Sequence, residues 1–289
     1  MSLRPLYARP RKLADVVATL ADIRTGAIVV AGGQEVMPHI NYGRLMPAAV
    51  IDICAIAELR GVTATADTVT IGALTTHRDL QNDATIGRLT PILAAAAAEV
   101  GGGRQVHNRG TVGGNIVAMH PLYDLAPALL ALKAEVDVED TSGPRRTSLA
   151  KLIAEASHGL GVRSVLSRIH VTAPGAGGGW GYRKLKATGG AYASANAAAV
   201  ATMAKGEIMS LSVVIGAATE RPIDASAALS RLHGRTWDQR TADEVESICA
   251  GLIAAPLADH QGAGPWRRAM AGVMARRAIG DAVARAKAA

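Results

Sequence analysis

Residues 105–115 read QVHNRGTVGGN, a polar, glycine-rich stretch. They follow three consecutive glycines (101–103), which end an apolar helix predicted from Pro91 to Val100 with Thr90 as its N-cap. We therefore expect residues 105–115 to form a loop. Glycines without Cβ atoms let a ligand approach the backbone closely, and successive N–H groups can form a nest for an anion. The spacing alone leaves two interpretations open, a phosphate-binding loop and an ordinary turn.

A second glycine pair, Gly32-Gly33, directly follows a predicted buried strand over residues 27–31. A helix predicted from Leu13 to Leu20 precedes that strand, and another strand over residues 48–53 follows the glycines. The opening of the chain is thus typical of a small α/β unit of roughly 55 residues. Two such glycine loops can hold one pyrophosphate from both sides. Neither loop is a Rossmann GxGxxG motif, and the chain has no Walker A motif.

The middle of the chain predicts alternating strands and helices. Two short strands between residues 62 and 73 flank Ala66-Asp67. The expected elements after the glycine-rich stretch are a helix over 124–134, a strand over 135–139, a helix over 149–157 and a strand over 162–171. Residues 174–179, PGAGGG, form the best candidate for a domain boundary.

Beyond that boundary the pattern changes. Residues 191–203 and 208–217 flank Lys205-Gly206 and predict an antiparallel hairpin, although the first arm is rich in Ala and a helix is the alternative. Helices are expected over residues 224–232, 241–254 and 265–286. Thr241 and Glu244 have the spacing of a capping box at the start of the second of these helices.

Length and composition favour a two-domain globular protein. The chain has 289 residues, of which 49% are hydrophobic and 19% charged. Phe is absent and aromatics total 3%, so the core is expected to consist of Ala, Val, Ile and Leu. No apolar stretch reaches the roughly 20 residues that span a bilayer, and the N-terminus does not have the pattern of a signal peptide. A cytoplasmic location is therefore expected.

The number of cysteines and the distribution of charge argue against several kinds of binding site. Cys54 and Cys249 are far apart in sequence, so neither a disulfide framework nor a structural zinc site is expected, and an iron–sulfur cluster needs about four ligands. The net charge of +7 is concentrated near the two ends of the chain. Nucleic-acid binding is disfavoured because stacking aromatics are scarce. A solvated helix face and a docking surface for an acidic partner both stay open.

No catalytic constellation is evident in the sequence. His120 and Asp124 are four residues apart and could share a helix face, but a metal would need a third ligand nearby, so a solvated or capping role is favoured. GxSxG and HExxH motifs are absent. We therefore expect no catalytic residue and no metal ligand in this chain.

The two glycine loops, taken with their surroundings, resemble the FAD-binding medium subunit of molybdenum hydroxylases, the carbon monoxide dehydrogenase and xanthine dehydrogenase family. The similar blocks are AGGQEV (31–36), VIDI (50–53), IGALTTH (71–77), QVHNRGTVGGN (105–115), DLAPAL (124–129), YRK (182–184) and WRRAM (266–270). They extend from about residue 5 to 280. The family typically has QVRNRGTIGGN where this chain has residues 105–115.

The resemblance implies an α+β fold. A two-lobed FAD-binding domain of the vanillyl-alcohol-oxidase/MurB (PCMH) type would occupy residues 1–175, with lobes of about 1–55 and 56–175. A small α+β domain with an antiparallel sheet and helices would occupy residues 180–289.

The resemblance also implies the residues that bind FAD. Ala31, Gly32, Gly33, Gln34, Glu35 and Val36 of the first loop, with Thr111, Gly113, Gly114 and Asn115 of the second, would hold the pyrophosphate. Asp124 would lie near the flavin or its ribityl chain, and Leu166 and Lys184 would approach the isoalloxazine ring. Gln34-Glu35 stands where Thr-Asp or His-Ser is commoner, and an acid beside a phosphate requires a side chain that points away.

In function, the resemblance implies an electron-transfer subunit. Electrons would reach FAD from [2Fe-2S] clusters in a small subunit, which receives them from a molybdenum cofactor in a large subunit, and FAD would reduce an external acceptor. A dimer of heterotrimers is the expected assembly. The alternatives are a stand-alone FAD-dependent oxidoreductase of the same fold and an assembly module that has lost FAD.

Overall fold

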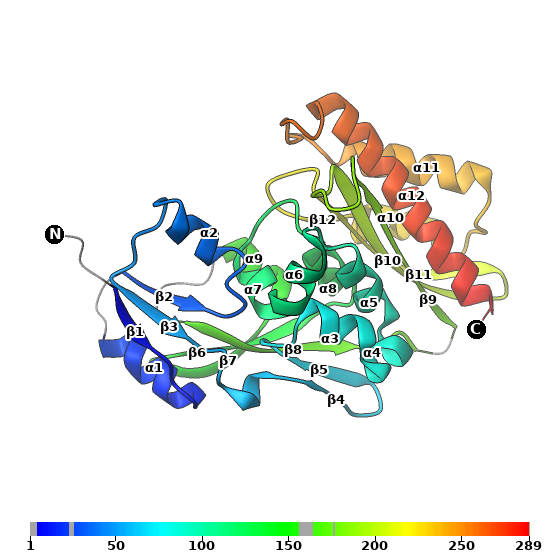
Figure 1. Ribbon diagram of the computed structural model, residues 1–289. Helices are drawn as coiled ribbons and strands as arrows, with labels where there is room; N and C mark the ends of the chain where they lie inside the picture. The colour runs from blue at the N-terminus through cyan, green and yellow to red at the C-terminus, as the bar shows by residue number, and fades with distance from the viewer. Residues whose placement is uncertain (1–4, 23–25, 156–163, 176, 289) are drawn as a thin grey trace.

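The computed structural model describes residues 5–22, 26–155, 164–175 and 177–288. Within these ranges the strands form three sheets, each with helices packed on it (Figure 1). The first sheet and its helices lie at one end, the second sheet lies along the base, and the third sheet lies above the helices of the second. The mixed α+β class expected from the sequence is confirmed.

The first sheet is parallel, with the strand order β1-β3-β2. Its elements are β1 (Leu6–Ala8), α1 (Leu13–Asp22), β2 (Ala27–Val30), α2 (Val36–Asn41) and β3 (Ala49–Asp52). Val16 and Leu20 of α1 are buried with Ile51 of β3, which is the helix–strand packing that the apolar spacing predicted. Strand β1 and helix α2 were not predicted. Helix α2 tolerates Pro38 because Pro38 lies in its first turn.

The second sheet is antiparallel, with the order β4-β5-β8-β6-β7. Its strands are β4 (Val62–Ala64), β5 (Thr68–Gly72), β6 (Glu135–Asp140), β7 (Gly143–Ser148) and β8 (Val165–Thr172). The helices of this part of the chain are η1 (Ala57–Leu59), α3 (His77–Asn82), α4 (Ala84–Leu89), α5 (Pro91–Ala98), α6 (Gly103–Arg109), α7 (Val112–Val117), α8 (Leu125–Ala131) and α9 (Leu149–Glu155). Residues 156–157 of the predicted helix and 162–163 of the predicted strand lie outside the described residues.

The prediction of a loop over residues 105–115 is wrong. Helix α6 continues to Arg109, and α7 begins at Val112 after two intervening residues. Gly110 and Thr111 between them are extended, and the Thr111 hydroxyl accepts a hydrogen bond from the N–H of Gly114 at 3.1 Å as the N-cap of α7. The glycines of TVGGN are therefore helical residues.

The third sheet is antiparallel, with the order β12-β11-β10-β9. Its strands are β9 (Gly178–Leu185), β10 (Ala195–Ala204), β11 (Glu207–Gly216) and β12 (Ile223–Asp224). Helices α10 (Ser226–Leu229), η2 (Ser230–Leu232), α11 (Gln239–Gly251) and α12 (Gly264–Ala288) complete this part of the chain. The predicted hairpin is confirmed, and the helical alternative for its first arm is excluded. Lys205 and Gly206 at its turn both have positive φ, which matches the right-handed twist of the strands.

The start of α11 differs from the prediction. Its N-cap is Asp238, whose carboxylate accepts the N–H of Thr241 at 2.8 Å. Thr241 is therefore inside the helix rather than its cap, and the expected capping box with Glu244 is wrong. Glu244 pairs instead with Arg235 and Arg231.

The core of the third sheet consists mainly of Ala, Val, Ile and Leu, as the composition predicted. Alternate Ala residues of β10 lie buried with Ala residues of α12. Gly179 and Gly181 on β9 allow the closest approach, because a Cβ on either would lie 1.9 Å from a carbonyl oxygen of α12. The opposite face of the sheet, including Tyr182, shares one buried cluster with helices of the second sheet. None of the helices described is long and apolar enough to cross a membrane.

Candidate functional site

A cavity of about 750 Å³ lies between the first sheet and the helices over the second sheet. Its lining includes residues 26–29, 31–36 and 45–47 from the first part of the chain. From later parts it includes residues 100–102, 110–111, 113–115, 117–118, 123–124, 164–166, 190 and 192. The volume is typical of sites for cofactors and other organic ligands. Of the thirteen site residues expected from sequence, the lining includes all except Lys184.

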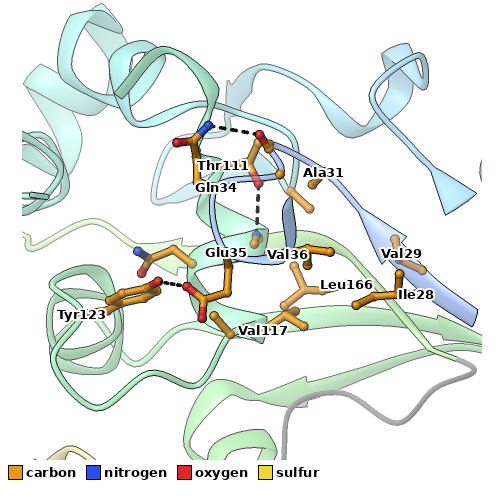
Figure 2. A pocket seen from close by; sticks show the side chains of 18 of the residues that line it. Ile28, Val29, Ala31, Gln34, Glu35, Val36, Thr111, Val117, Tyr123 and Leu166 are labelled. Atoms are coloured by element: carbon orange, nitrogen blue, oxygen red, sulfur yellow. Dashed lines mark hydrogen bonds between the residues drawn. The ribbon is translucent and has the colours of Figure 1, made fainter. Parts of the chain in front are cut away.

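The first glycine loop connects β2 to α2 along one wall of the cavity (Figure 2). Gly33 has φ of +73°, which favours glycine. At position 32 the reason for glycine is steric. A Cβ there would lie 1.9 Å from the carbonyl oxygen of Arg109 at the end of α6. The two glycine-rich segments, far apart in sequence, therefore touch through their backbones.

The first loop also leaves its donors free. Within the described residues, no backbone N–H of residues 32–36 donates a hydrogen bond to the protein. Five successive unpaired N–H groups beside a cavity form an electropositive surface that suits an anion. The arrangement is consistent with the expected nest, whose role in binding stays a prediction.

The second glycine segment is arranged differently. The N–H groups of Val112 and Gly113 donate to the carbonyls of Thr75 and Ala73 at 2.9 Å, and those of Gly114 and Asn115 donate to the Thr111 hydroxyl and carbonyl. The expectation that this segment also presents free N–H groups is therefore wrong. Its contribution to the cavity is the bare surface of Gly114, where a Cβ would meet only the Thr111 hydroxyl oxygen within 4 Å.

Two side-chain atoms of the cavity wall are buried and unpaired. The Asn115 Oδ1 and the His77 Nδ1 have no hydrogen-bond partner among the described residues. Burial lowers the pKa of His77 to about 4, with neighbouring His107 acting in the same direction, so the ring is neutral at physiological pH. Unpaired polar atoms beside a cavity indicate a ligand that bonds to them.

Asp124 lies in a buried polar network that connects the second and third sheets. Its Oδ1 accepts from the Tyr182 hydroxyl at 2.7 Å, and its Oδ2 accepts from Lys184 Nζ at 2.8 Å. The same ammonium donates to the Glu99 carbonyl at 2.8 Å. Burial raises the pKa of the Asp124 carboxyl, while the Lys184 ammonium and the Tyr182 hydroxyl act in the opposite direction. Lys184 therefore lies behind Asp124, with a side chain only 1% exposed.

An aromatic cluster that the sequence did not predict lies beside Asp124. The ring of His120 stacks on Tyr123 at 4.6 Å and on Tyr192 at 5.1 Å between centroids. Tyr123 and Tyr192 both line the cavity, and the Tyr123 hydroxyl donates to the Glu35 carboxylate (Figure 2). Burial raises the pKa of Tyr123 and lowers that of His120. Only the tertiary fold brings Tyr192 to this cluster, so no local pattern could have identified it.

The residues described contain no group of three or more His, Cys, Asp or Glu side chains placed to hold a metal. His120 instead accepts the N–H of Leu122 at 3.2 Å through Nδ1. The candidate site is thus a cavity with a nest of free N–H groups, a buried carboxylate and an aromatic wall, which suits an elongated ligand with an anionic part and a planar part.

Two family models match consecutive parts of the chain. Residues 1–174 match the family model described as "FAD binding domain in molybdopterin dehydrogenase", and residues 180–282 match the "CO dehydrogenase flavoprotein C-terminal domain". The carbon monoxide dehydrogenase medium chain of Hydrogenophaga pseudoflava is 32% identical over 285 residues, which cover 96% of this chain and 97% of the relative.

Two solved structures superpose closely on this chain. A carbon monoxide dehydrogenase from Hydrogenophaga pseudoflava, which lacks the Mo-pyranopterin moiety of its molybdenum cofactor, superposes with a TM-score of 0.93 at 30% identity, covering 99% of both chains. Quinoline 2-oxidoreductase from Pseudomonas putida 86 superposes with a TM-score of 0.91 at 26% identity, covering 98% of both chains.

Proposed function

Since the chain belongs to the family of FAD-binding subunits of molybdopterin dehydrogenases, we propose that it is the electron-transfer flavoprotein subunit of a molybdenum-containing hydroxylase or dehydrogenase. Electrons would arrive from iron–sulfur clusters in a partner subunit and leave through FAD to an external acceptor. The observation that carries the proposal is the row of free N–H groups at residues 32–36 beside a cavity of cofactor size.

The residues present fit FAD. The nest suits the diphosphate, because hydrogen bonds from N–H groups to an anion contribute about 1.5–3 kcal/mol each. The bare surface of Gly114 and the close contact at Gly32 let the diphosphate lie against backbone on both sides. Asn115 Oδ1, buried and unpaired, is available to a ribose hydroxyl. These features support binding by Ala31, Gly32, Gly33, Gln34, Glu35, Val36, Thr111, Gly113, Gly114 and Asn115.

The two ends of the cavity differ in chemistry, and this supports an orientation for the cofactor. Ile28 and Val29 lie together away from Tyr123 in Figure 2 and make that end apolar, which suits the adenine. The other end holds Asp124, Tyr123 and Tyr192, which suit the ribityl chain and the isoalloxazine ring. Leu166 also lines the cavity and would approach the isoalloxazine ring, as the resemblance implies.

When bound, FAD supplies the redox chemistry, since a flavin accepts and donates electrons singly or in pairs. The protein would hold the cofactor in position. Asp124, held by Tyr182 and Lys184, presents a fixed carboxylate at the cavity wall. Lys184 does not line the cavity and would act through Asp124. Its ammonium also donates to the Glu99 carbonyl, and this bond links the third sheet to the segment after α5. No residue of this chain is assigned an acid–base role.

The proposal includes the division into domains and the partners. Residues 1–175 would bind FAD, with lobes of about 1–55 and 56–175, and residues 180–289 would form the C-terminal domain. Cys54 and Cys249 cannot ligate an iron–sulfur cluster alone, because such clusters take about four ligands. The clusters and the molybdenum cofactor would therefore belong to a small and a large partner subunit, in a dimer of heterotrimers.

Purification from the native host tests the proposal. The chain should copurify with a molybdenum subunit and an iron–sulfur subunit. Acid precipitation should release yellow flavin into the supernatant, because no His or Cys stands in a known flavin-linkage motif. Two results would overturn the proposal: a folded protein that cannot be loaded with FAD, or robust substrate turnover by the isolated FAD-loaded chain, which would identify a stand-alone enzyme.

A further inference from the structure

Glu35 presents an electrostatic problem for the nest. It lies within the run of free N–H groups at residues 32–36, and its side chain lines the same cavity. A carboxylate that turned toward those N–H groups would compete with an anionic ligand and repel it, since like charges a few ångströms apart interact strongly at a partly buried site. Glu35 occupies the N-cap position of α2 but makes no capping hydrogen bond with its side chain. The carboxylate is therefore directed elsewhere by other contacts.

Two side chains hold the Glu35 carboxylate. The Tyr123 hydroxyl donates to Oε2, and Figure 2 shows the two side chains pointing toward each other. His39, one turn further along α2, has Nε2 3.3 Å from Oε1. The His39 side chain is 45% exposed, so solvent weakens this second contact. Tyr123 is the stronger of the two partners.

Tyr123 is itself held in place. Its ring stacks on His120 with an interplanar angle of 22° and lies 6.0 Å from the ring of Tyr192. The Asn196 side-chain amide of the third sheet lies 3.4 Å from the Tyr123 carbonyl oxygen. The hydroxyl is thus presented by a residue packed between elements rather than by a free side chain.

We propose that Tyr123 is a positioning residue that holds the Glu35 carboxylate away from the N–H groups of residues 32–36, so that an acidic residue in this loop is compatible with a bound diphosphate. The inference rests on the proposed FAD function. Removing the Tyr123 hydroxyl frees the carboxylate to turn toward the nest. Removing the charge of Glu35 makes the hydroxyl unnecessary.

The test is FAD titration by fluorescence quenching of four proteins: the parent, Tyr123→Phe, Glu35→Gln and the double variant. Phe keeps the stacked ring, and Gln keeps an acceptor oxygen without the charge. Tyr123→Phe should weaken FAD binding about tenfold, and the loss should shrink at high salt because it is electrostatic. Glu35→Gln should bind FAD about threefold more tightly than the parent, because it removes a negative charge beside the diphosphate and keeps the backbone N–H of residue 35. The double variant should recover to the same range, giving a strongly non-additive cycle. Circular dichroism of each apo protein checks folding.

The outcomes separate this inference from the function on which it rests. If the parent does not bind FAD, the proposed function is wrong. If the parent binds and Tyr123→Phe binds equally well, the positioning role of Tyr123 is wrong and the function stands. A double variant as weak as Tyr123→Phe would also overturn the inference, because the hydroxyl would then act without Glu35.

Discussion

The two glycine segments of the cavity look alike in sequence and differ in structure. Gly32-Gly33 leaves five successive N–H groups unpaired within the described residues, whereas every N–H from Val112 to Asn115 donates to the protein itself. The first segment follows the end of a strand, so its backbone has no neighbouring strand to bond. The second begins a helix and also bonds to Ala73 and Thr75 at the end of β5. A glycine pair therefore indicates that another group can approach the backbone closely. Whether the backbone N–H groups are also free to bind a ligand depends on the hydrogen bonds that the surrounding backbone makes.

The largest expected effect is at the contact between the two segments. Gly32→Ala places a Cβ 1.9 Å from the Arg109 carbonyl oxygen, so the segments must separate and the nest must change shape. FAD affinity should fall at least about a hundredfold, which is roughly 2.7 kcal/mol, as measured by equilibrium titration.

Gly87→Ala is the control for that variant, since Gly87 lies exposed in α4 with no atom within 4 Å of an added Cβ. Gly87→Ala should bind FAD like the parent. Equal binding by Gly32→Ala and the parent would show that the close contact is unimportant for the cofactor.

A second prediction concerns pH and the anchoring of the second segment. The N–H of His77 donates to the Gly110 carbonyl at 3.0 Å, and the His77 ring is buried. Its folded pKa of about 4 lies below the ordinary value near 6.5, so the unfolded chain binds more protons between these values. Stability should therefore fall as pH drops from 6.5 toward 4, with a contribution of about 2 kcal/mol lost at pH 5.

Urea unfolding at pH 8 and pH 5 measures that loss. His77→Gln lacks the titrating group, so its stability should change less between the two pH values than that of the parent. An identical pH dependence of both proteins would show that His77 is not the group responsible.

A third prediction addresses the bare surface of the second segment. Gly114→Ala adds a methyl group whose carbon lies 2.9 Å from the Thr111 hydroxyl oxygen and otherwise faces open space beside the cavity. FAD affinity should fall about tenfold, less than for Gly32→Ala, because no N–H donor is lost. In the absence of FAD, stability should change little, since the helical gain of Ala over Gly offsets the contact with the cap. A loss as large as that of Gly32→Ala would show that FAD contacts Gly114 as closely as it contacts the first loop, which contradicts the lesser role assigned to the second segment.

The smallest effect is expected at the cap of α7. Thr111→Ala removes the acceptor of the Gly114 N–H and should destabilise the protein by about 1 kcal/mol in thermal or urea unfolding. Thr111→Ser retains a hydroxyl and should restore most of that stability. If both variants unfold like the parent, the cap does not contribute to stability.

The sequence predicted the architecture better than the local chemistry of the site. Apolar spacing located α1, β2, β3 and the β10–β11 hairpin because each of these elements buries one regular face. Helix propensity predicts a loop for the TVGGN residues, because two glycines disfavour a helix. The Thr111 cap and the bonds to β5, a tertiary contact, outweigh that preference.

Twelve of the thirteen site residues expected from sequence line one cavity, because family motifs record positions that a ligand approaches. The same motifs do not record which atoms are already bonded. The occupied N–H groups after Thr111, and the position of Lys184 behind Asp124, follow from partners distant in sequence. The contact between Glu35 and Tyr123 is of the same kind.

Amide hydrogen exchange with and without FAD, resolved by residue, tests the central claim most directly. The account predicts that N–H groups of residues 32–36 exchange rapidly in the FAD-free protein and become protected when FAD binds, while those of residues 112–115 are protected in both states. Residues 32–36 that exchange at the same rate with and without bound FAD would contradict the claim that the first glycine loop holds the diphosphate.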